Sequence, residues 1–492
     1  MSLIDVRNLT FAYEGSGTRV FENVTLQIDT DWKLGFIGRN GRGKTTFLNL
    51  LLGKYDYDGE IASKVHFDYF PFDVRPGRLD TIDVIRRILP GSLLWEIERE
   101  LSLLQVDGEA MYRSFQTLSY GEQTKVLLAS LFLRENNFLL IDEPTNHLDM
   151  DGRKTVSEYL SSKRGFILVS HDRAFLDDCV DHILSINKTK IDLQKGDFSS
   201  WWENKTRQDT LELSENEKLR KEIVRLSESA RRTNHWSKEV EKTKFGTRNA
   251  GLRPDRGYIG HKAAKMMKRS KSIENRQQSA IEEKKKLLKD IEDTEKLKIF
   301  QLGYHGKRLA ELEKVSIFYG SRMACREVSF TIDQGDRIAL TGRNGSGKSS
   351  LVRLLRGDDI RYTGTFRKGS QLEISTVLQE TSFLQGSLDD YAKENGVDGT
   401  LFRSMLRKLD FSRDHFGMDM SDFSAGQKKK VLIARSLCEK KHLHIWDEPL
   451  NFIDVFSRIQ IEELLLEYSP TILFVEHDRD FCRNIATKTV EL

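Results

Sequence analysis

The sequence predicts an α/β protein made of two similar halves joined by a long antiparallel α-helical hairpin. Two observations support this fold class. A glycine-rich loop between an apolar run and a helical run occurs once in each half. Between the halves lies a stretch rich in Leu, Glu, Lys and Arg, in which apolar residues recur at helical spacing. The expected domains are residues 1–204, 205–300 and 301–492.

Composition favours a soluble protein with real hydrophobic cores. Of the 492 residues, 38% are hydrophobic and 31% are charged. No apolar run approaches the ~20 residues that a membrane span needs, and the N-terminus has no secretory pattern. The four cysteines stand alone without CxxC spacing, so we expect buried thiols rather than zinc or disulfides. These features predict a cytoplasmic protein.

The two loops, Gly38–Thr45 and Gly342–Ser349, match the phosphate-binding pattern GxxxxGK[ST]. Glycines let backbone N–H groups close around phosphates, and the following helix adds its dipole. Lys44 and Lys348 are expected to reach the β- and γ-phosphates of ATP, while the Thr45 and Ser349 hydroxyls bind Mg²⁺. The expected ATP-binding residues of the loops are Gly38, Asn40, Gly41, Gly43, Lys44, Thr45, Thr46, Gly342, Asn344, Gly345, Gly347, Lys348, Ser349 and Ser350.

An acid pair and a histidine follow each loop at matching distances. Apolar runs end at Asp142-Glu143 and Asp447-Glu448, which lie 99 and 100 residues after the loop lysines. His171 and His477 follow 28 and 29 residues later. The aspartates are expected to bind Mg²⁺, and the glutamates to polarise the attacking water. A single loop match occurs by chance, but three elements in register twice predict tandem nucleotide-binding halves.

A fourth element identifies the family. Ser119-Tyr-Gly121 and Ser424-Ala-Gly426 each lie 24 residues before the glutamate of their half. This combination resembles the ABC ATPases, and the resemblance covers both halves. It implies a monomer in which the two halves close head-to-tail around two ATP molecules. One site would combine the first loop and acids with Ser424 and Gly426, and the other would combine the second loop and acids with Ser119 and Gly121.

Three further features bear on these sites. Tyr13 and Tyr319 lie where the family stacks adenine, although a tyrosine of the core or of a turn is the alternative. The family usually carries a glutamine after the loop, as a further metal ligand. Gln379 fits in the second half, but Phe72 takes that place in the first. In the segment after the acid pair, Leu450 of the second half stands where the first half has Thr145, so the two sites are expected to differ.

The linker is strongly basic. Residues 231–271 hold 13 Lys or Arg and 3 Asp or Glu, whereas the whole chain is only +3. Two apolar seams with a break at Gly246–Gly260 predict the hairpin, and the charge gathers at its tip. A solvated basic helix or a flexible connector is the alternative. One-signed charge interleaved with aromatics favours RNA. The expected tip contacts are Lys242, Lys244, Phe245, Arg248, Arg253 and Arg256.

Soluble tandem ATPases with such a linker resemble the ABC-F branch, and the wide tip resembles its antibiotic-resistance members of Lsa type. That resemblance implies ribosome binding at the tRNA exit site, with the tip near 23S rRNA of the peptidyl-transferase centre and P-site tRNA. It also implies displacement of lincosamide, pleuromutilin and streptogramin A drugs, with no role for DNA or a membrane. The alternatives are a housekeeping ABC-F translation factor and the ATPase subunit of a drug-efflux transporter.

Overall fold

The computed structural model describes residues 2–15, 19–72, 74, 79–134, 136–146, 148–187, 189–242 and 302–492, with Lys265, Lys268, Lys271, Ser272 and Arg276 of the linker. The chain forms two compact units. One contains Met1–Trp201 together with Lys296–Leu492, and the other contains Trp202–Glu295. Both nucleotide-binding halves therefore belong to one unit, while most of the linker forms the other.

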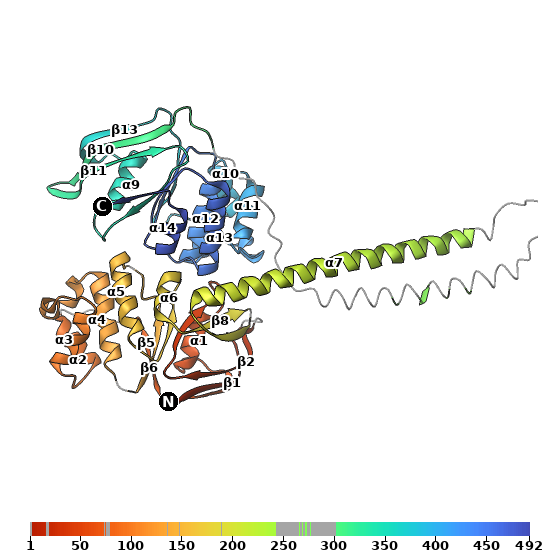
Figure 1. Ribbon diagram of the computed structural model, residues 1–492, viewed down its shortest axis with the longest axis horizontal. Helices are drawn as coiled ribbons and strands as arrows, with labels where there is room; N and C mark the ends of the chain where they lie inside the picture. The colour runs from red at the N-terminus through yellow and green to blue at the C-terminus, as the bar shows by residue number, and fades with distance from the viewer. Residues whose placement is uncertain are drawn as a thin grey trace, which may run out of the picture. The chain divides into compact units, whose positions relative to one another are not determined.

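The described residues of the first half form two sheets (Figure 1). The larger sheet has the order β5-β6-β7-β3-β8-β9 and is parallel except for β9, and the smaller antiparallel sheet has the order β2-β1-β4. The strands are β1 (Leu3–Ala12), β2 (Arg19–Asp29), β3 (Lys33–Ile37), β4 (Asp58–Ala62), β5 (His66–Phe70), β6 (Asn137–Asp142), β7 (Phe166–Val169), β8 (His182–Asn187) and β9 (Lys190–Lys195).

Helices cover this sheet and form a separate group between β5 and β6. In Figure 1 that group, which includes α2, α3 and α4, lies on the side of the half away from β1 and β2. The helices are α1 (Lys44–Leu51), α2 (Thr81–Ile88), α3 (Leu94–Leu103), η1 (Gly108–Tyr112), η2 (Phe115–Thr117), α4 (Tyr120–Phe132), α5 (Met150–Ser161) and α6 (Arg173–Cys179).

The second half repeats this plan, so the predicted tandem α/β fold is confirmed. Its sheets have the orders β14-β15-β16-β12-β17 and β11-β10-β13. The strands are β10 (Arg308–Tyr319), β11 (Arg322–Asp333), β12 (Arg337–Thr341), β13 (Arg361–Lys368), β14 (Ile374–Val377), β15 (Leu443–Asp447), β16 (Ile472–Val475) and β17 (Lys488–Glu491). The helices are α9 (Lys348–Arg356), α10 (Leu388–Glu394), α11 (Gly399–Lys408), η4 (Asp414–Gly417), η5 (Met420–Asp422), α12 (Ala425–Cys438), α13 (Val455–Tyr468) and α14 (Arg479–Ile485).

The central strands are fully buried apolar runs, which is why their ends can present functional groups. Phe138, Leu140, Leu443 and Ile445 are inaccessible to solvent. Strands covered on both faces read as continuous apolar sequence, and their carboxyl ends share one edge of the sheet. The acid pairs that end β6 and β15 therefore lie at the edge where the phosphate loops also begin.

The linker starts as one long helix, α7 (Phe198–Lys242). It begins earlier than the predicted start at Lys205, because Asp197 accepts a hydrogen bond from the Ser200 backbone N–H at 2.9 Å and so caps the first turn. Its 45 residues correspond to about 70 Å of helix at ~1.5 Å per residue. Leu219 and Ile223 of the predicted apolar seam are half-buried. The predicted turn, Gly246–Gly260, lies outside the described residues.

Candidate nucleotide-binding site

The two phosphate loops have the same local geometry. Gly43 and Gly347 precede α1 and α9 with φ of 96° each, a conformation that a residue with a Cβ rarely adopts. Lys44 Nζ donates to the Gly38 carbonyl at 2.7 Å, and Lys348 Nζ to the Gly342 carbonyl at 2.8 Å. Burial lowers the pKa of both lysines. Each ammonium is thus folded back over its own loop, in position to exchange a carbonyl for a phosphate oxygen.

The acid pairs sit on strained backbone at the ends of β6 and β15. Glu143 has φ of 52° and Glu448 has φ of 47°, both in the left-handed region. Such strain persists only where the surroundings fix it, and it concentrates at functional sites. The Thr45 hydroxyl donates to Asp142 at 3.0 Å, as expected for two groups that share a metal. Burial raises the pKa of Asp142 and of Asp447, so each carboxyl lies in an environment that favours a cation beside it.

Residues from both halves line one pocket of about 830 Å³. The first half contributes its loop and its acid pair with His171, and the second half contributes the start of α12. The structure thus brings together the residues that were predicted for the first composite site. Those among them that line the pocket are Tyr13, Asn40, Gly41, Gly43, Lys44, Thr45, Thr46, Asp142, Glu143, His171, Ser424 and Gly426.

The contact across this pocket explains the glycine of the Ser-x-Gly step. A Cβ on Gly426 would lie 2.4 Å from the Phe452 carbonyl oxygen and 3.1 Å from Asn40 Nδ2. Asn40 in turn donates to the same Phe452 carbonyl at 2.8 Å. Ser424 caps α12 by accepting from the Gln427 N–H, and Gly426 brings the start of this helix close to Asn40 of the first phosphate loop. Only glycine allows that approach.

A different hydrogen bond joins the halves at the second composite site. The Asn344 backbone N–H donates to Asp149 at 3.2 Å, from the second loop to the segment after the first acid pair. Ser119 caps α4 as Ser424 caps α12. The predicted partners Gly121 and Ser119 thus lie at the start of α4, on the half opposite the second loop. Their role in ATP binding remains a prediction.

The two glutamates that are predicted to be catalytic are held differently. Glu448 Oε2 accepts from Gln379 Nε2 at 2.8 Å and from Asn451 Nδ2 at 2.6 Å. Glu143 Oε1 is buried without a hydrogen-bond partner among the described residues, and His171 Nε2 lies 3.3 Å away. Burial, followed by the neighbouring Asp142, raises the pKa of Glu143 to about 8.

Strand register explains this difference. Phe70 pairs with Ile141, and Val377 pairs with Trp446, and each partner directly precedes the aspartate of its half. Phe70 and Val377 are therefore equivalent, which places Phe72 at the position of Gln379. The prediction that Phe72 stands where the second half has Gln379 therefore agrees with the backbone register. At that position the first half has no side-chain amide that could donate to Glu143. The role of Gln379 as a metal ligand remains a prediction.

The buried groups fit a divalent cation in each site. Asp447 Oδ1 is buried and unpartnered among the described residues, as is Glu143 Oε1 in the first half. Hydroxyl and carboxylate oxygens are the ligands that Mg²⁺ prefers. Thr45 with Asp142, and Ser349 with Asp447, would hold it. When bound, Mg²⁺ would neutralise charge on the ATP phosphates.

The two predicted adenine-stacking tyrosines have different surroundings. Tyr13 is 44% exposed, lines the composite pocket, and is hydrogen-bonded through its hydroxyl to Thr46 at 2.6 Å. Tyr319 is 42% exposed and lies under the guanidinium of Arg353, at 5.9 Å from its ring centroid. Both side chains are therefore partly exposed, and stacking on ATP remains a prediction.

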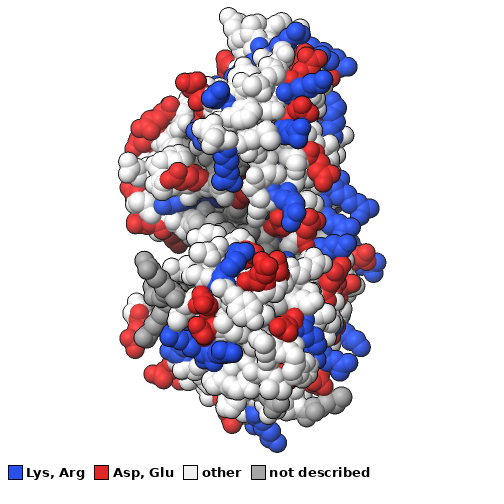
Figure 2. All heavy atoms as spheres, turned by 90° about the vertical axis from the view of Figure 1, so that its left-hand side faces the viewer, with Lys and Arg blue, Asp and Glu red and all other residues white. Residues whose placement is uncertain are grey.

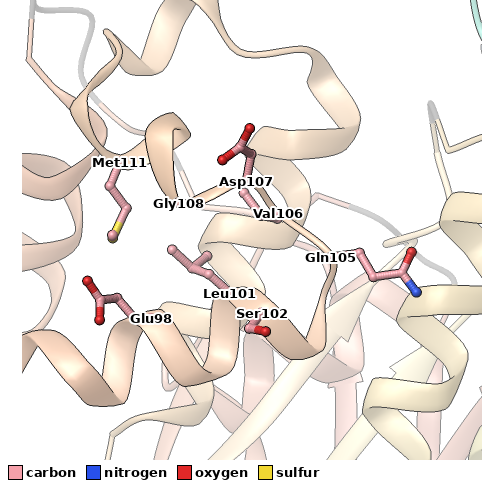
Figure 3. Close-up of a pocket in the computed structure, with 8 residues that line it drawn as sticks. All are labelled: Glu98, Leu101, Ser102, Gln105, Val106, Asp107, Gly108 and Met111. Atoms are coloured by element: carbon pink, nitrogen blue, oxygen red, sulfur yellow. The ribbon is translucent and has the colours of Figure 1, made fainter.

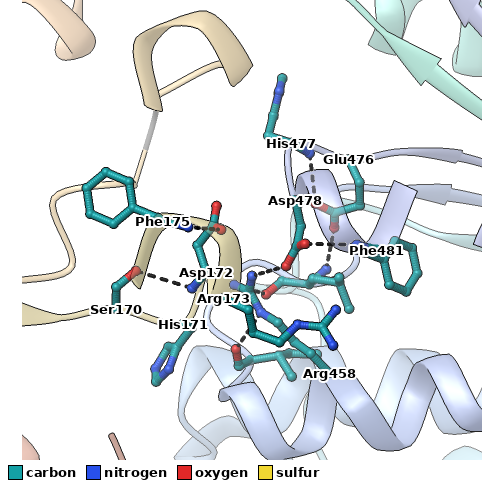
Figure 4. A network of polar contacts seen from close by, with 12 residues as sticks. Ser170, His171, Asp172, Arg173, Phe175, Arg458, Glu476, His477, Asp478 and Phe481 are labelled. Atoms are coloured by element: carbon teal, nitrogen blue, oxygen red, sulfur yellow. Dashed lines mark hydrogen bonds and ion pairs between the residues drawn. The ribbon is translucent and has the colours of Figure 1, made fainter. Parts of the chain in front are cut away.

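The histidine segments form a polar network at the meeting of the halves (Figure 4). Asp172 caps α6 by accepting from the Phe175 N–H. Asp478 caps α14 in the same way, by accepting from the Phe481 N–H. Burial is the main reason that the pKa of His477 falls to about 4, so its imidazole is neutral at pH 7. The pKa of His171 is lowered for the same reason.

The second half carries a buried carboxylate where the first has a serine. Glu476 replaces Ser170 in front of the histidine, and accepts from the Leu450 N–H at 2.7 Å and from the His477 N–H at 3.0 Å (Figure 4). Leu450 stands where the first half has Thr145. The two residues that differ between the halves, Leu450 and Glu476, are thus in direct contact, and the geometry of the second site differs from that of the first.

Two pairs of site residues escaped sequence reasoning. Arg153 and Arg458 follow Asp149 and Asp454 by one helical turn and donate to Asp172 at 2.7 Å and Asp478 at 2.8 Å. Lys430 of α12 lines the pocket and pairs with Asp454 at 3.2 Å. The arginine contact recurs in both halves, and Lys125 and Asp149 stand in the sequence at the positions equivalent to Lys430 and Asp454, so aligning the halves with each other would have singled these residues out.

A second cavity carries none of the predicted ATP residues. It measures about 510 Å³ and lies in the helical group of the first half, between α3 and η1 (Figure 3). Its lining combines Leu101, Val106 and Met111 with Glu98 and Asp107.

On the face shown in Figure 2 acidic and basic side chains are intermixed, without a broad field of one sign.

The predicted tip contacts of the linker, apart from Lys242 at the end of α7, lie outside the described residues. They are Lys244, Phe245, Arg248, Arg253 and Arg256. Within the described part of the chain, no helix is both long and apolar enough to cross a membrane.

Comparison with known proteins agrees with this geometry. Residues 21–146 and 325–451 match the family described as "ABC transporter". The chain is 29% identical over 488 residues to the ATP-binding protein Uup of Caulobacter vibrioides, covering 96% of this chain and 74% of that protein. It is also 29% identical over 475 residues to the ribosome protection protein VmlR of Bacillus subtilis, covering 96% and 83%.

Among solved structures, the archaeal ribosome recycling factor aABCE1, in complex with the ribosomal stalk protein aP1, has the same tandem fold. The TM-score is 0.65 at 18% identity, covering 98% of this chain and 87% of that one. The matches to tandem ATP-binding proteins extend over nearly the whole chain. With two copies of the family's ATP-binding domain, the chain belongs to the ABC transporter family and is an ATPase.

Proposed function

We propose that this protein is an ABC-F ATPase that binds the ribosome in the cytoplasm and protects it against antibiotics. The observation that carries the proposal is the pocket lined by both halves, since ATP bound there would hold the halves closed. The long helix α7 leaves the first half directly after β9, so closure can act on the linker. A relative named a ribosome protection protein supports the biological role.

In this proposal the chain's own groups divide the work of hydrolysis. The loop lysines Lys44 and Lys348 give up their carbonyl partners to bind phosphate oxygens. Glu143 and Glu448 orient the attacking water, and neutral His171 and His477 lie beside them. Hydrolysis then removes the ligand that joins the halves, and the protein leaves the ribosome.

The proposed target is the drug site reached from the tRNA exit site. The linker tip would extend toward 23S rRNA of the peptidyl-transferase centre beside P-site tRNA, and would displace lincosamide, pleuromutilin and streptogramin A drugs. The basic composition of residues 231–271 supports contact with RNA. Mg²⁺ and ATP would be needed for binding, and the active form would be a monomer.

A trapped variant tests ribosome binding. Glu143→Gln combined with Glu448→Gln should retain ATP and sediment with ribosomes when ATP is present, while the unmodified chain should be released. If the variant stays in the supernatant, ribosome association is wrong.

A shortened linker tests protection. Deleting residues 244–256 should abolish drug resistance in cells while ATPase activity survives, because the described residues that line the pocket belong to the two halves. A housekeeping translation factor, which the match to Uup also supports, predicts no change in drug susceptibility. An efflux ATPase predicts that expression lowers the accumulation of labelled drug, whereas ribosome protection leaves it unaltered.

A further inference from the structure

The first site lacks the amide that Gln379 contributes to the second, and a tyrosine lies beside the metal-binding carboxylate instead. Tyr69, near the end of β5, lines the composite pocket. Its hydroxyl donates to Asp142 Oδ2 at 3.0 Å. The Thr45 hydroxyl donates to the same oxygen, also at 3.0 Å. Two hydroxyl groups from different elements thus converge on one oxygen of the carboxylate.

The tyrosine side chain is fixed along its length. Its ring packs against the hydrophobic core of the first half, and the Lys54 ammonium lies 5.2 Å from the ring centroid. A carboxylate oxygen only accepts, so the Tyr69 hydroxyl is the donor in its hydrogen bond to Asp142. The side chain therefore presents one donor at one defined place.

The second half has no matching group. Tyr69 pairs with Leu140, and Thr376 pairs with Ile445 at the equivalent step of β14 and β15. A threonine hydroxyl is attached directly to Cβ and falls short of the reach of a tyrosine by the length of the ring. The tyrosine hydroxyl is therefore a feature of the first site, in the half that has Phe72 instead of glutamine.

We infer that Tyr69 is a positioning residue for the metal of the first ATP site. Its hydrogen bond, together with that of Thr45, holds Oδ2 of Asp142 in place, so that the other oxygen of the carboxylate can face the metal. The inference rests on the proposed role of Asp142 as a metal ligand. It assigns to the first site a support that sequence motifs of the family do not contain.

Metal affinity, measured apart from nucleotide affinity, tests the inference. In an Asp447→Asn background, which removes the metal ligand of the second site, Mn²⁺ binding is titrated by electron paramagnetic resonance with a non-hydrolysable ATP analogue. Tyr69→Phe removes a single oxygen and should weaken Mn²⁺ binding by about tenfold or more, as for other groups that orient a metal ligand. Tyr112→Phe, which changes an exposed tyrosine of the same half, is the matched control and should leave it unchanged.

Nucleotide affinity in EDTA should be the same for Tyr69→Phe as for its parent. If it falls as well, the hydroxyl serves the shape of the pocket and the inference is overturned. It is also overturned if Mn²⁺ affinity changes by less than about twofold, well under the effect expected of such a group. Asp142→Asn tests the metal site separately from the role of Tyr69. If this variant retains full Mn²⁺ affinity, the proposed metal site itself is wrong.

Discussion

A buried ion pair between the halves is expected to contribute to the free energy of their closure around ATP. Arg173, at the start of α6, pairs with Glu462 of α13. Their side chains are 12% and 7% exposed. Glu462 has one further partner, the Asn484 amide at 3.3 Å. Because the pair spans the two halves, its loss should affect closure more than the folding of either half.

The size of the effect follows from burial. Removing one partner of a buried pair costs about 3–5 kcal/mol, because the other charge stays desolvated. Here opening of the halves readmits water and Asn484 retains its bond, so we expect about 3 kcal/mol at most on the closure equilibrium. That corresponds to about a 100-fold increase in the ATP concentration needed for closure. Replacing both partners by apolar residues should restore most of the loss.

Closure is measurable by fluorescence transfer between dyes on the two halves. The four native cysteines are buried, so cysteines introduced at the exposed positions Asp56 and Lys440 can be labelled selectively. The parent is the Glu143→Gln, Glu448→Gln chain, which holds ATP. The variants are Arg173→Met alone and together with Glu462→Leu.

The matched control is Arg19→Met, which breaks the exposed pair between Arg19 and Glu22 within the first half. Exposed pairs contribute about 0–1 kcal/mol, so closure should not change. If Arg173→Met shifts the half-closure concentration by less than about threefold, the pair does not hold the halves together. If the double variant is as impaired as the single one, the cost does not come from a stranded charge.

Three other predictions concern the separate parts of the sites. With the first site silenced by Glu143→Gln, Gln379→Ala should slow hydrolysis about tenfold, because Glu448 loses one of its two amide donors; an unchanged single-turnover rate would contradict this. Tyr13→Ala should weaken ATP binding about tenfold while Tyr13→Phe preserves it, as isothermal titration would show, if the exposed ring stacks on adenine. Burial lowers the pKa of His444 to about 4, below its unfolded value near 6.5, so its stabilising contribution is complete above pH ~6.5 and is lost as pH falls toward 4. Between pH 7 and pH 5 the free energy of unfolding, measured with urea, should therefore fall by about 2 kcal/mol less in His444→Asn than in the unmodified chain.

The sequence could predict the catalytic groups because each lies within a short segment that has one physical purpose. A phosphate loop requires glycines and a lysine at fixed spacing, and a buried strand that ends in acids reads clearly even in a single sequence. The pairing of the halves followed from the repeat, and the pocket lined by Lys44 and Ser424 agrees with it.

Other contacts were out of reach because they depend on register and docking. Tyr69 is one aromatic residue among several in its strand, and only the pairing of β5 with β6 shows that its hydroxyl reaches Asp142. The contact between Arg173 and Glu462 depends on how two surfaces meet, which no periodicity encodes. Composition gave the charge of the linker tip but no geometry for it.

The two ATP sites differ in which acid the protein supports. In the second site two amides donate to Glu448, the residue that is predicted to activate water. In the first site two hydroxyls donate to Asp142, the predicted metal ligand, while Glu143 Oε1 has no hydrogen-bond donor among the described residues. A site that fixes its metal ligand but not its water-activating group is better suited to retaining nucleotide than to rapid turnover. The first site is therefore expected to keep the halves together while the second sets the rate of opening.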